Sequence, residues 1–277
     1  MVKLGRDIAH LEEMAKEVRK DIVEMTYLAH SGHPGGSLSS VEILVSLYFS
    51  ELNQSPETVD SPDRDRFVLS KGHITPAFYS VLSHAGYIPH EELKQFRKVN
   101  SRLQGHPAST KLKGIEVSTG SLGQGLSVAI GIALAGKIDK RDYRVYCLVG
   151  DGEMEEGQIW EAIMFAGNRH LNNLILFLDY NGLQIDGEVA KINDIAPVIS
   201  KFEAFKWHTF EINGHSFDQI FKAIDEAKRY PDNPTAIIAH TVKGKGISFM
   251  ENAYEWHGKA PNEEQYKQAM KELNANG

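Results

Sequence analysis

Apolar runs that alternate with helical patterns limit most strongly what this chain can fold into. Four runs are nearly unbroken and rich in β-branched and aromatic residues: YRVYCLV (143–149), NLILFLDY (173–180), WHTFEI (207–212) and TAIIAHT (235–241). Such runs are typical of strands that are covered on both faces. A shorter run, RFVLS (66–70), precedes them, and helical patterns lie between them, at 159–166 and 217–227. The alternation predicts an α/β fold with a mostly parallel sheet flanked by helices on both faces.

Two helices are expected before the first strand. Apolar residues recur at three- and four-residue steps from Ile8 to Leu28, which predicts an amphipathic helix. The segment SGHPGGS (31–37) interrupts this pattern. A second helix is predicted to begin at a capping box formed by Ser39 and Glu42. Because no repeat and no Pro-rich linker divides the chain, we expect a single domain over residues 1–277.

The composition restricts the partners and the setting of the protein. The formal net charge of -7 argues against nucleic acid as a partner of the surface as a whole. No stretch approaches the roughly 20 apolar residues that cross a bilayer, so no membrane partner is expected. The single cysteine, Cys147, lies inside an apolar run. One cysteine forms no internal disulfide, which favours a reducing, cytoplasmic setting.

Glycines and charged residues follow the predicted strands at the points where they end. The segments are KGH (71–73), GDG (150–152), DYNG (179–182) and TVKGKG (241–246). Ligands of open parallel sheets bind outside the carboxyl ends of the strands. We therefore expect these four segments to meet along one rim of the sheet and to form a ligand site there.

The triplet Gly150, Asp151 and Gly152 predicts a metal site. Its glycines permit a close approach of a ligand, and the start of the following helix favours phosphate. Asp151 would repel that phosphate unless a cation lay between them, and Mg²⁺ binds through few protein oxygens plus phosphate oxygens. Asn181 could add an amide oxygen and Leu183 its backbone carbonyl. Taken singly, Asp-Gly and Asn-Gly are also common turn dipeptides.

The two halves of this site together resemble a known signature. GDGEMEEG (150–157), followed after one helix and one strand by DYNGLQIDG (179–187), is similar to the thiamine diphosphate signature, and in detail to that of transketolase. Further blocks resemble transketolase in the family's order: SGHPGGSLS, RDRFVLSKGH, QGHP, EVSTGSLGQGLSVAIGIALA, FEAFKW and TVKGKGISFMENAYEWHGKAPN. The resemblance implies a thiamine diphosphate-binding fold with thiamine diphosphate and Mg²⁺ as cofactors.

The matching blocks cover only the amino-terminal, diphosphate-binding half of a full-length transketolase. The resemblance therefore implies a split enzyme, whose pyrimidine-binding half lies on a separate partner chain. The pairing of subunits in the family implies self-association into an α2β2 assembly. Sugar phosphates are the implied substrates.

Four histidines lie in the matching blocks: His33, His73, His106 and His257. By the resemblance, His33 and His257 line the reacting carbons and move protons, whereas His73 and His106 contact cofactor phosphate or substrate hydroxyls. Histidine suits this work because its ordinary pKa lies near neutral pH. Other histidines lack such a context and are expected to be solvated helix residues: His10, His84, His90 and His170.

The resemblance also assigns the contacts to the cofactor. They fall on His73, Gly120, Leu122, Gly150, Asp151, Gly152, Glu156, Asn181 and His257, with Asp151, Asn181 and Leu183 as metal ligands. Gly120 and Leu122 lie in TGSLGQG, which is similar to the loop over the thiazolium and diphosphate. Glu156 is assigned to a carboxylate cluster at the subunit interface, or is simply favoured by the helix dipole. Lys243 and Lys245 are either phosphate or interface contacts or solvated loop residues.

Three functions stay open at this point. The first is a transketolase subunit, which moves a two-carbon ketol unit from a ketose phosphate to an aldose phosphate and is active only with its partner. The second is a subunit of a 2-oxo acid dehydrogenase or a deoxyxylulose-phosphate synthase, families that should lack the combination of SGHPGG, KGH and QGHP. The third is a binding module that keeps the metal and diphosphate site without catalysis.

Overall fold

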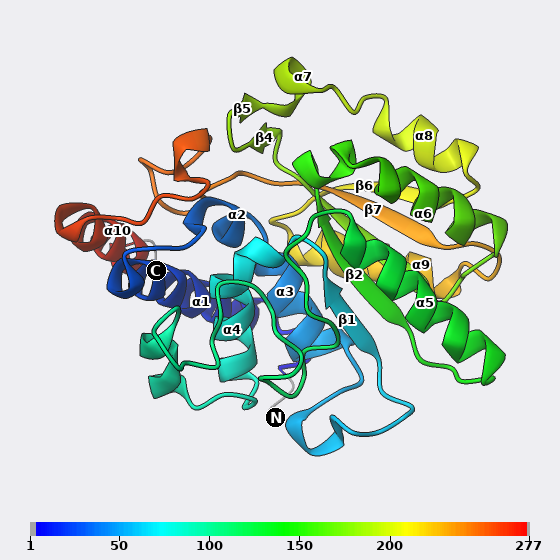
Figure 1. The fold of residues 1–277 in the computed structure, drawn as a ribbon, viewed down its shortest axis with the longest axis horizontal. Coiled ribbons are helices and arrows are strands. Elements are labelled where there is room, and N and C mark those ends of the chain that lie inside the picture. Colours follow the sequence, from blue (N-terminus) through cyan, green and yellow to red (C-terminus); the bar gives the residue numbers. More distant parts are fainter. Residues whose placement is uncertain (1–3, 276–277) are drawn as a thin grey trace.

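A five-stranded parallel sheet forms the centre of the protein in a computed structural model that describes residues 4–275 (Figure 1). Its strands follow one another in the spatial order β1 (Arg66–Leu69), β2 (Val145–Gly150), β3 (Leu174–Tyr180), β7 (Thr235–His240) and β6 (His208–Asn213). Each strand is parallel to its neighbours. The predicted α/β fold with a mostly parallel sheet is confirmed.

Helices cover both faces of this sheet, as the sequence predicted. Tyr146 and Leu148 of β2 point into one core, and Cys147 and Val149 point into the other, because successive side chains of a strand alternate. The first core is built with α1 (Ile8–Ala29), α2 (Pro34–Ser39), α3 (Val41–Ser46), α4 (Thr75–His84), α9 (Phe217–Arg229) and α10 (Glu263–Ala275). The second is built with α5 (Gln124–Ile138), α6 (Gly157–Asn168), α7 (Val189–Ile192) and α8 (Val198–Ala204).

The strand at the β6 edge differs from the expectation of cover on both faces. It pairs only with β7, and of its six residues only Ile212 is buried. The apolar character of the run WHTFEI is due largely to Trp207 and Phe210. Trp207 is buried but precedes the strand, and Phe210 is only partly buried.

The prediction of a capping box at Ser39 and Glu42 is wrong. Instead, α2 ends at Ser39 and α3 begins after Ser40. The hydroxyls of Ser39 and Ser40 donate to the Asp179 carboxylate at 2.6 and 3.0 Å, and Glu42 pairs with Arg19 at 2.5 Å. Partners that are distant in sequence therefore take the polar groups that a local cap would have used.

The loops at the carboxyl ends of β1, β2, β3 and β7 converge on one rim of the sheet, as predicted. The loop after β3 adds a short antiparallel hairpin that the sequence analysis did not foresee, formed by β4 (Leu183–Gln184) and β5 (Gly187–Glu188). Within residues 4–275, no helix is both long and apolar enough to cross a membrane.

Candidate active site

A cleft lies at this rim, and most of the residues that were assigned from the sequence line it. They are His73, Leu122, Gly150, Asp151, Gly152, Asn181, Leu183 and His257, and Lys71 and Lys243 join them. Two of the other assigned residues lie beside histidines of the matching blocks. His33 lies beside His73 and His257, and a Cβ placed on Gly120 would come within 2.8 Å of the His106 ring.

Asp151 is buried at the centre of this cleft, with 2% of its surface exposed. Its Oδ1 accepts a hydrogen bond from the backbone N–H of Gly152 at 2.8 Å, and its Oδ2 accepts from that of Gly182 at 2.5 Å. Burial, together with the negative charge of Asp179, raises the pKa of Asp151 to about 6. A carboxylate in such surroundings is stabilised by an added cation.

The predicted metal ligands fit Mg²⁺ by their chemistry. Asp151 offers a carboxylate, Asn181 an amide oxygen and Leu183 a backbone carbonyl, and such oxygen donors are those that Mg²⁺ prefers. The Leu183 carbonyl accepts a hydrogen bond from Lys243 Nζ at 3.1 Å. This ammonium shows that the Leu183 side of the cleft already accommodates a positive charge.

Glu153 is a buried residue of the rim that sequence reasoning missed. Its Oε1 accepts from the Ser70 hydroxyl at 2.5 Å and from the Gly123 N–H at 2.9 Å, and its Oε2 accepts from the Gly150 N–H at 3.1 Å. A single carboxylate thus joins the loops that carry KGH, TGSLGQG and GDG. The only signal in the sequence was its place in the acidic run after GDG.

A buried ion pair lies beneath the cleft and was also missed. Lys71 pairs with Asp179, and their side chains are 2% and 0% exposed. Ser39, Ser40 and Thr241 also donate hydroxyl hydrogen bonds to this carboxylate. Burial alone would raise the pKa of Asp179, but the ammonium and the hydroxyls hold it at about 2. Both residues lie in segments that we expected at the rim, KGH and DYNG.

The four histidines of the matching blocks come together, as predicted. The ring centroids of His33 and His73 are 5.2 Å apart, those of His33 and His257 are 5.4 Å apart, and those of His73 and His257 are 5.0 Å apart. His106 lies further out, with its ring 6.4 Å from that of His33. Loops that are more than two hundred residues apart in the sequence therefore present their imidazoles to one space.

These imidazoles are neutral at physiological pH. Burial, followed by the charges of Arg97, His106 and Lys243, lowers the pKa of His33 to about 4. Burial, then the charge of Lys243, lowers that of His257 to about 3. The pKa values of His73 and His106 are also lowered, mainly by burial.

The cations beside the histidines also set their tautomers. Lys243 Nζ lies 3.0 Å from His257 Nδ1, and Arg97 Nη2 lies 3.4 Å from His33 Nδ1. Because ammonium and guanidinium groups only donate, Nδ1 accepts in both rings and Nε2 carries the hydrogen. Arg97 was not identified from the sequence. Lys243 is buried, so the alternative that it is a solvated loop residue is wrong. Burial, followed by the positive charge of Lys71, lowers the pKa of Lys243 to about 8.

Several predicted residues lie away from the cleft. Glu156 is exposed at the residue before α6 and does not line the cleft, so its contact with the cofactor stays a prediction. Lys245 pairs with Glu251 at 3.3 Å. His10 is an exposed residue of α1, as expected, whereas His90 and His170 are exposed but lie in a 3₁₀ turn and in the turn after α6. The expectation is wrong for His84, which is partly buried with its Nε2 3.0 Å from Asp21.

The parallel sheet, the glycine and carboxylate rim and the buried cations define a domain of the diphosphate-binding α/β class. Residues 11–276 match the family described as transketolase, thiamine diphosphate binding domain. The chain belongs to this family, and the resemblance stated from its motifs is confirmed. It is part of an enzyme of the transketolase type.

Relatives of similar length are named as subunits. The chain is 44% identical to the 6-deoxy-6-sulfo-D-fructose transketolase subunit SqwG of Clostridium sp. (strain MSTE9), over 96% of this chain and 97% of that protein. It is 42% identical to one subunit of the apulose-4-phosphate transketolase of Phocaeicola vulgatus, over 95% of this chain and 93% of that protein.

Other relatives are much longer. The transketolase of Homo sapiens is 41% identical over 95% of this chain, which spans 42% of that protein. The crystal structure of transketolase from Campylobacter jejuni superposes with a TM-score of 0.92 and 37% identity, and covers 97% of this chain and 43% of its own. The chain thus corresponds to about two fifths of these transketolases.

Proposed function

We propose that this protein is the diphosphate-binding subunit of a two-chain transketolase. In this proposal it moves a two-carbon ketol unit from a ketose phosphate to an aldose phosphate, with thiamine diphosphate and Mg²⁺. The observation that carries the proposal is the cleft in which neutral His33, His73 and His257 stand next to the buried Asp151. The two relatives of similar length that are named as transketolase subunits support it.

The rim would hold the cofactor through its diphosphate. Asp151, Asn181 and the Leu183 carbonyl are the proposed ligands of Mg²⁺, and the loop with Gly120 and Leu122 is the proposed cover of the thiazolium. The glycines Gly150 and Gly152, together with His73, are further proposed contacts. When bound, thiamine diphosphate supplies the nucleophilic carbon that accepts and releases the two-carbon unit.

The histidines of this chain orient the sugar and move its protons. His33 and His257 carry their hydrogens on Nε2, so each donates a hydrogen bond to a sugar oxygen as negative charge develops there. Lys243 donates to Nδ1 of His257 at 3.0 Å. Because the pKa of Lys243 is about 8, its ammonium can replace the proton that His257 gives up near neutral pH. His73 and His106 are proposed to contact cofactor phosphate or substrate hydroxyls.

A partner chain is proposed to supply the pyrimidine-binding half of the site, in an assembly with two copies of each subunit. Exposed apolar side chains on α5 and α6 support an interface on these helices: Val128, Met164 and Phe165 are each at least 39% exposed. Glu156, exposed at the start of α6, is a proposed member of a carboxylate cluster at this interface.

The substrate test compares sugars in the reconstituted enzyme. This chain would be purified together with a candidate pyrimidine-binding chain and assayed for ketol transfer from xylulose 5-phosphate to ribose 5-phosphate. The names of the two relatives make 6-deoxy-6-sulfo-D-fructose and apulose 4-phosphate the second donors to assay. The chain alone should be inactive, and transfer by this chain alone would contradict the two-chain proposal.

The metal assignment has its own test. Asp151→Ala should abolish Mg²⁺-dependent binding of thiamine diphosphate to the assembled enzyme, as measured by calorimetry. Asp186→Ala is the matched control, because Asp186 is an exposed carboxylate on the neighbouring hairpin turn. Wild-type affinity in the Asp151 variant would refute the proposed metal ligands.

A further inference from the structure

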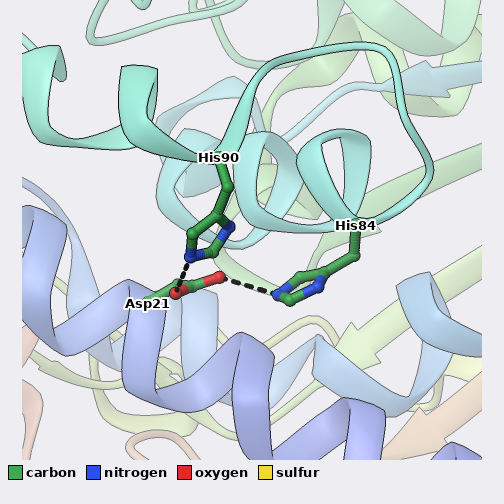
Figure 2. A group of neighbouring side chains, drawn as sticks. All are labelled: Asp21, His84 and His90. Atoms are coloured by element: carbon green, nitrogen blue, oxygen red, sulfur yellow. Dashed lines mark hydrogen bonds and ion pairs between the residues drawn. The ribbon is translucent and has the colours of Figure 1, made fainter.

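A second group of metal-binding side chains lies away from the cleft, where α1 packs against α4. Asp21 lies in the middle of α1, His84 is the last residue of α4, and His90 begins the 3₁₀ turn His90–Gln95. Figure 2 shows the two imidazole rings turned toward opposite oxygens of the Asp21 carboxylate. A metal ion is commonly held by three or more histidine, cysteine or acidic side chains. Among residues 4–275, these three side chains bring their ligand atoms close enough together to share one ion.

The distances fit one small ion. Nε2 of His84 lies 3.0 Å from Asp21 Oδ2, and Nε2 of His90 lies 3.5 Å from Asp21 Oδ1. Ligands of tetrahedral Zn²⁺ stand about 2.0–2.2 Å from the metal, which puts neighbouring ligand atoms roughly 3.3 Å apart. The ligand atoms of all three side chains lie within 4.8 Å of one another, so that one ion could join them after adjustment of the side chains.

Hydroxyl groups of α4 hold two of these side chains in place. Ser80 Oγ donates to Asp21 Oδ2 at 2.6 Å, and Ser83 Oγ lies 3.3 Å from His90 Nδ1. When Nδ1 of His90 donates to this hydroxyl, its Nε2 is free of hydrogen and can bind a metal. Outer partners of this kind are typical of metal-ligating histidines and carboxylates.

The charge at this place also calls for a cation. The Asp21 side chain is only 10% exposed, and its ion-pair partners within the described part of the chain are these histidines alone. The same crevice is lined by Glu24 and Lys94, which bring one further charge of each sign. The His90 side chain is 58% exposed, so the open side of the group faces water. A buried carboxylate is costly unless a positive charge or a metal compensates it.

We propose that Asp21, His84 and His90 bind Zn²⁺, with a water molecule as the fourth ligand. Imidazole and carboxylate groups in a tetrahedral arrangement suit this metal. The site is distinct from the proposed Mg²⁺ site, whose donors are all oxygens. Bound Zn²⁺ would join α1 to α4 and to the 3₁₀ turn that leads into Arg97, the residue whose guanidinium lies beside His33.

The binding test uses the full chain after removal of metals with a chelator and return to Mg²⁺ buffer. Equilibrium dialysis with elemental analysis should give one Zn²⁺ per chain. His84→Ala and His90→Ala should each weaken this binding by more than about 100-fold, beyond the 10- to 100-fold that loss of an outer partner costs. His10→Ala is the control, because His10 pairs with Asp7 at 2.9 Å on the surface without a third ligand.

Two further readouts decide between this site and the cleft. Zn²⁺ should raise the unfolding temperature of the wild-type chain and of His33→Ala, but not that of His90→Ala, whose exposed position leaves the fold intact. Co²⁺ in place of Zn²⁺ should give the strong visible absorption of a tetrahedral site, again lost only in the His84 and His90 variants. Equal Zn²⁺ binding in all the variants, or loss of binding in His33→Ala alone, would overturn the proposal.

Discussion

Two groups of histidines in this molecule have opposite electrostatic surroundings. In the cleft, His33 and His257 stand beside Arg97 and Lys243, and their pKa values are lowered to about 4 and about 3. At the contact of α1 and α4, His84 and His90 instead face the buried carboxylate of Asp21. The comparison teaches that the neighbouring charges decide what a histidine can do. Burial, and then nearby cations, keep the cleft imidazoles neutral and suit them to donate hydrogen bonds to sugar oxygens, whereas a neighbouring carboxylate suits an imidazole to a cation site.

The positive surroundings of the cleft agree with its proposed ligands. The chain as a whole carries a net charge of -7, yet Lys71 and Lys243 are among its most buried side chains and both lie at the rim. Burying an ammonium is costly. Asp179 compensates that cost for Lys71, and an anion such as a diphosphate would compensate it for Lys243. At Asp21 the buried charge is negative, so a cation would compensate it there.

The largest expected effect separates the two groups by catalysis. In the enzyme reconstituted with its partner, His257→Ala should lower turnover by about 10²–10⁴, the range for loss of a positioned acid or base. Binding of thiamine diphosphate should change little. His84→Ala should leave turnover within about twofold, because His84 does not reach the cleft. Steady-state kinetics checks both variants, and equal losses in both would remove the functional distinction.

The next effect concerns the ion pair beneath the cleft. Lys71→Met leaves Asp179 buried without its cation, which should cost about 3–5 kcal/mol in the free energy of unfolding. The control is Lys113→Met, which breaks the exposed pair between Lys113 and Asp60 and should cost about 0–1 kcal/mol. Denaturant unfolding of the two variants measures the difference. Equal costs would mean that the cleft charges are not buried as described.

A smaller loss of stability is expected at the other group. In metal-free buffer, His84→Ala removes one partner of the buried Asp21 and should cost about 1–3 kcal/mol. The loss is smaller than for Asp179 because the side chains of His84 and Asp21 are 20% and 10% exposed, whereas those of Lys71 and Asp179 are 2% and 0% exposed. Unfolding curves with and without Zn²⁺ measure this cost separately from metal binding. A loss as large as that in Lys71→Met would place the two carboxylates in similar surroundings.

The finest test of the comparison is the pH dependence of the cleft histidines. His33 and His257 have folded-state pKa values of about 4 and about 3, below the ordinary 6.5. The unfolded chain therefore binds more protons between these values, and stability should fall as the pH drops from about 6.5 toward 3 to 4. Histidine NMR titration should show the pKa of His257 rising in Lys243→Met. An unchanged pKa would mean that the charge of Lys243 does not help to lower it.

Much of the fold could be predicted because its signals are local. Unbroken apolar runs mark strands that are buried on both faces, and the rule for ligands at the carboxyl ends of strands placed Asp151 and Asn181 at one rim. The histidines of the cleft were found because they lie in Gly- or Pro-marked blocks that resemble those of transketolase. What failed was local reasoning about polar groups, such as the capping box at Ser39.

The missed features depend on contacts between distant segments. Lys71 and Asp179 are 108 residues apart, and Asp21 and His84 are 63 residues apart. No spacing in the sequence relates the members of either group, because different helices and strands bring them together. Glu153 was missed for another reason: it stands in a run with Glu155 and Glu156, and only the fold decides which of these carboxylates turns inward.

The order of residues around the cleft also bears on how the protein is made. β7 inserts between β3 and β6, and the loop after it carries Lys243, followed further on by His257. A ribosome must therefore release the chain past residue 257 before all of the cleft residues of this chain can come together. We expect the vitamin-derived cofactor to bind only after this segment has folded, so that, with the partner chain present, protection from proteases by thiamine diphosphate would first appear in fragments that extend past residue 257.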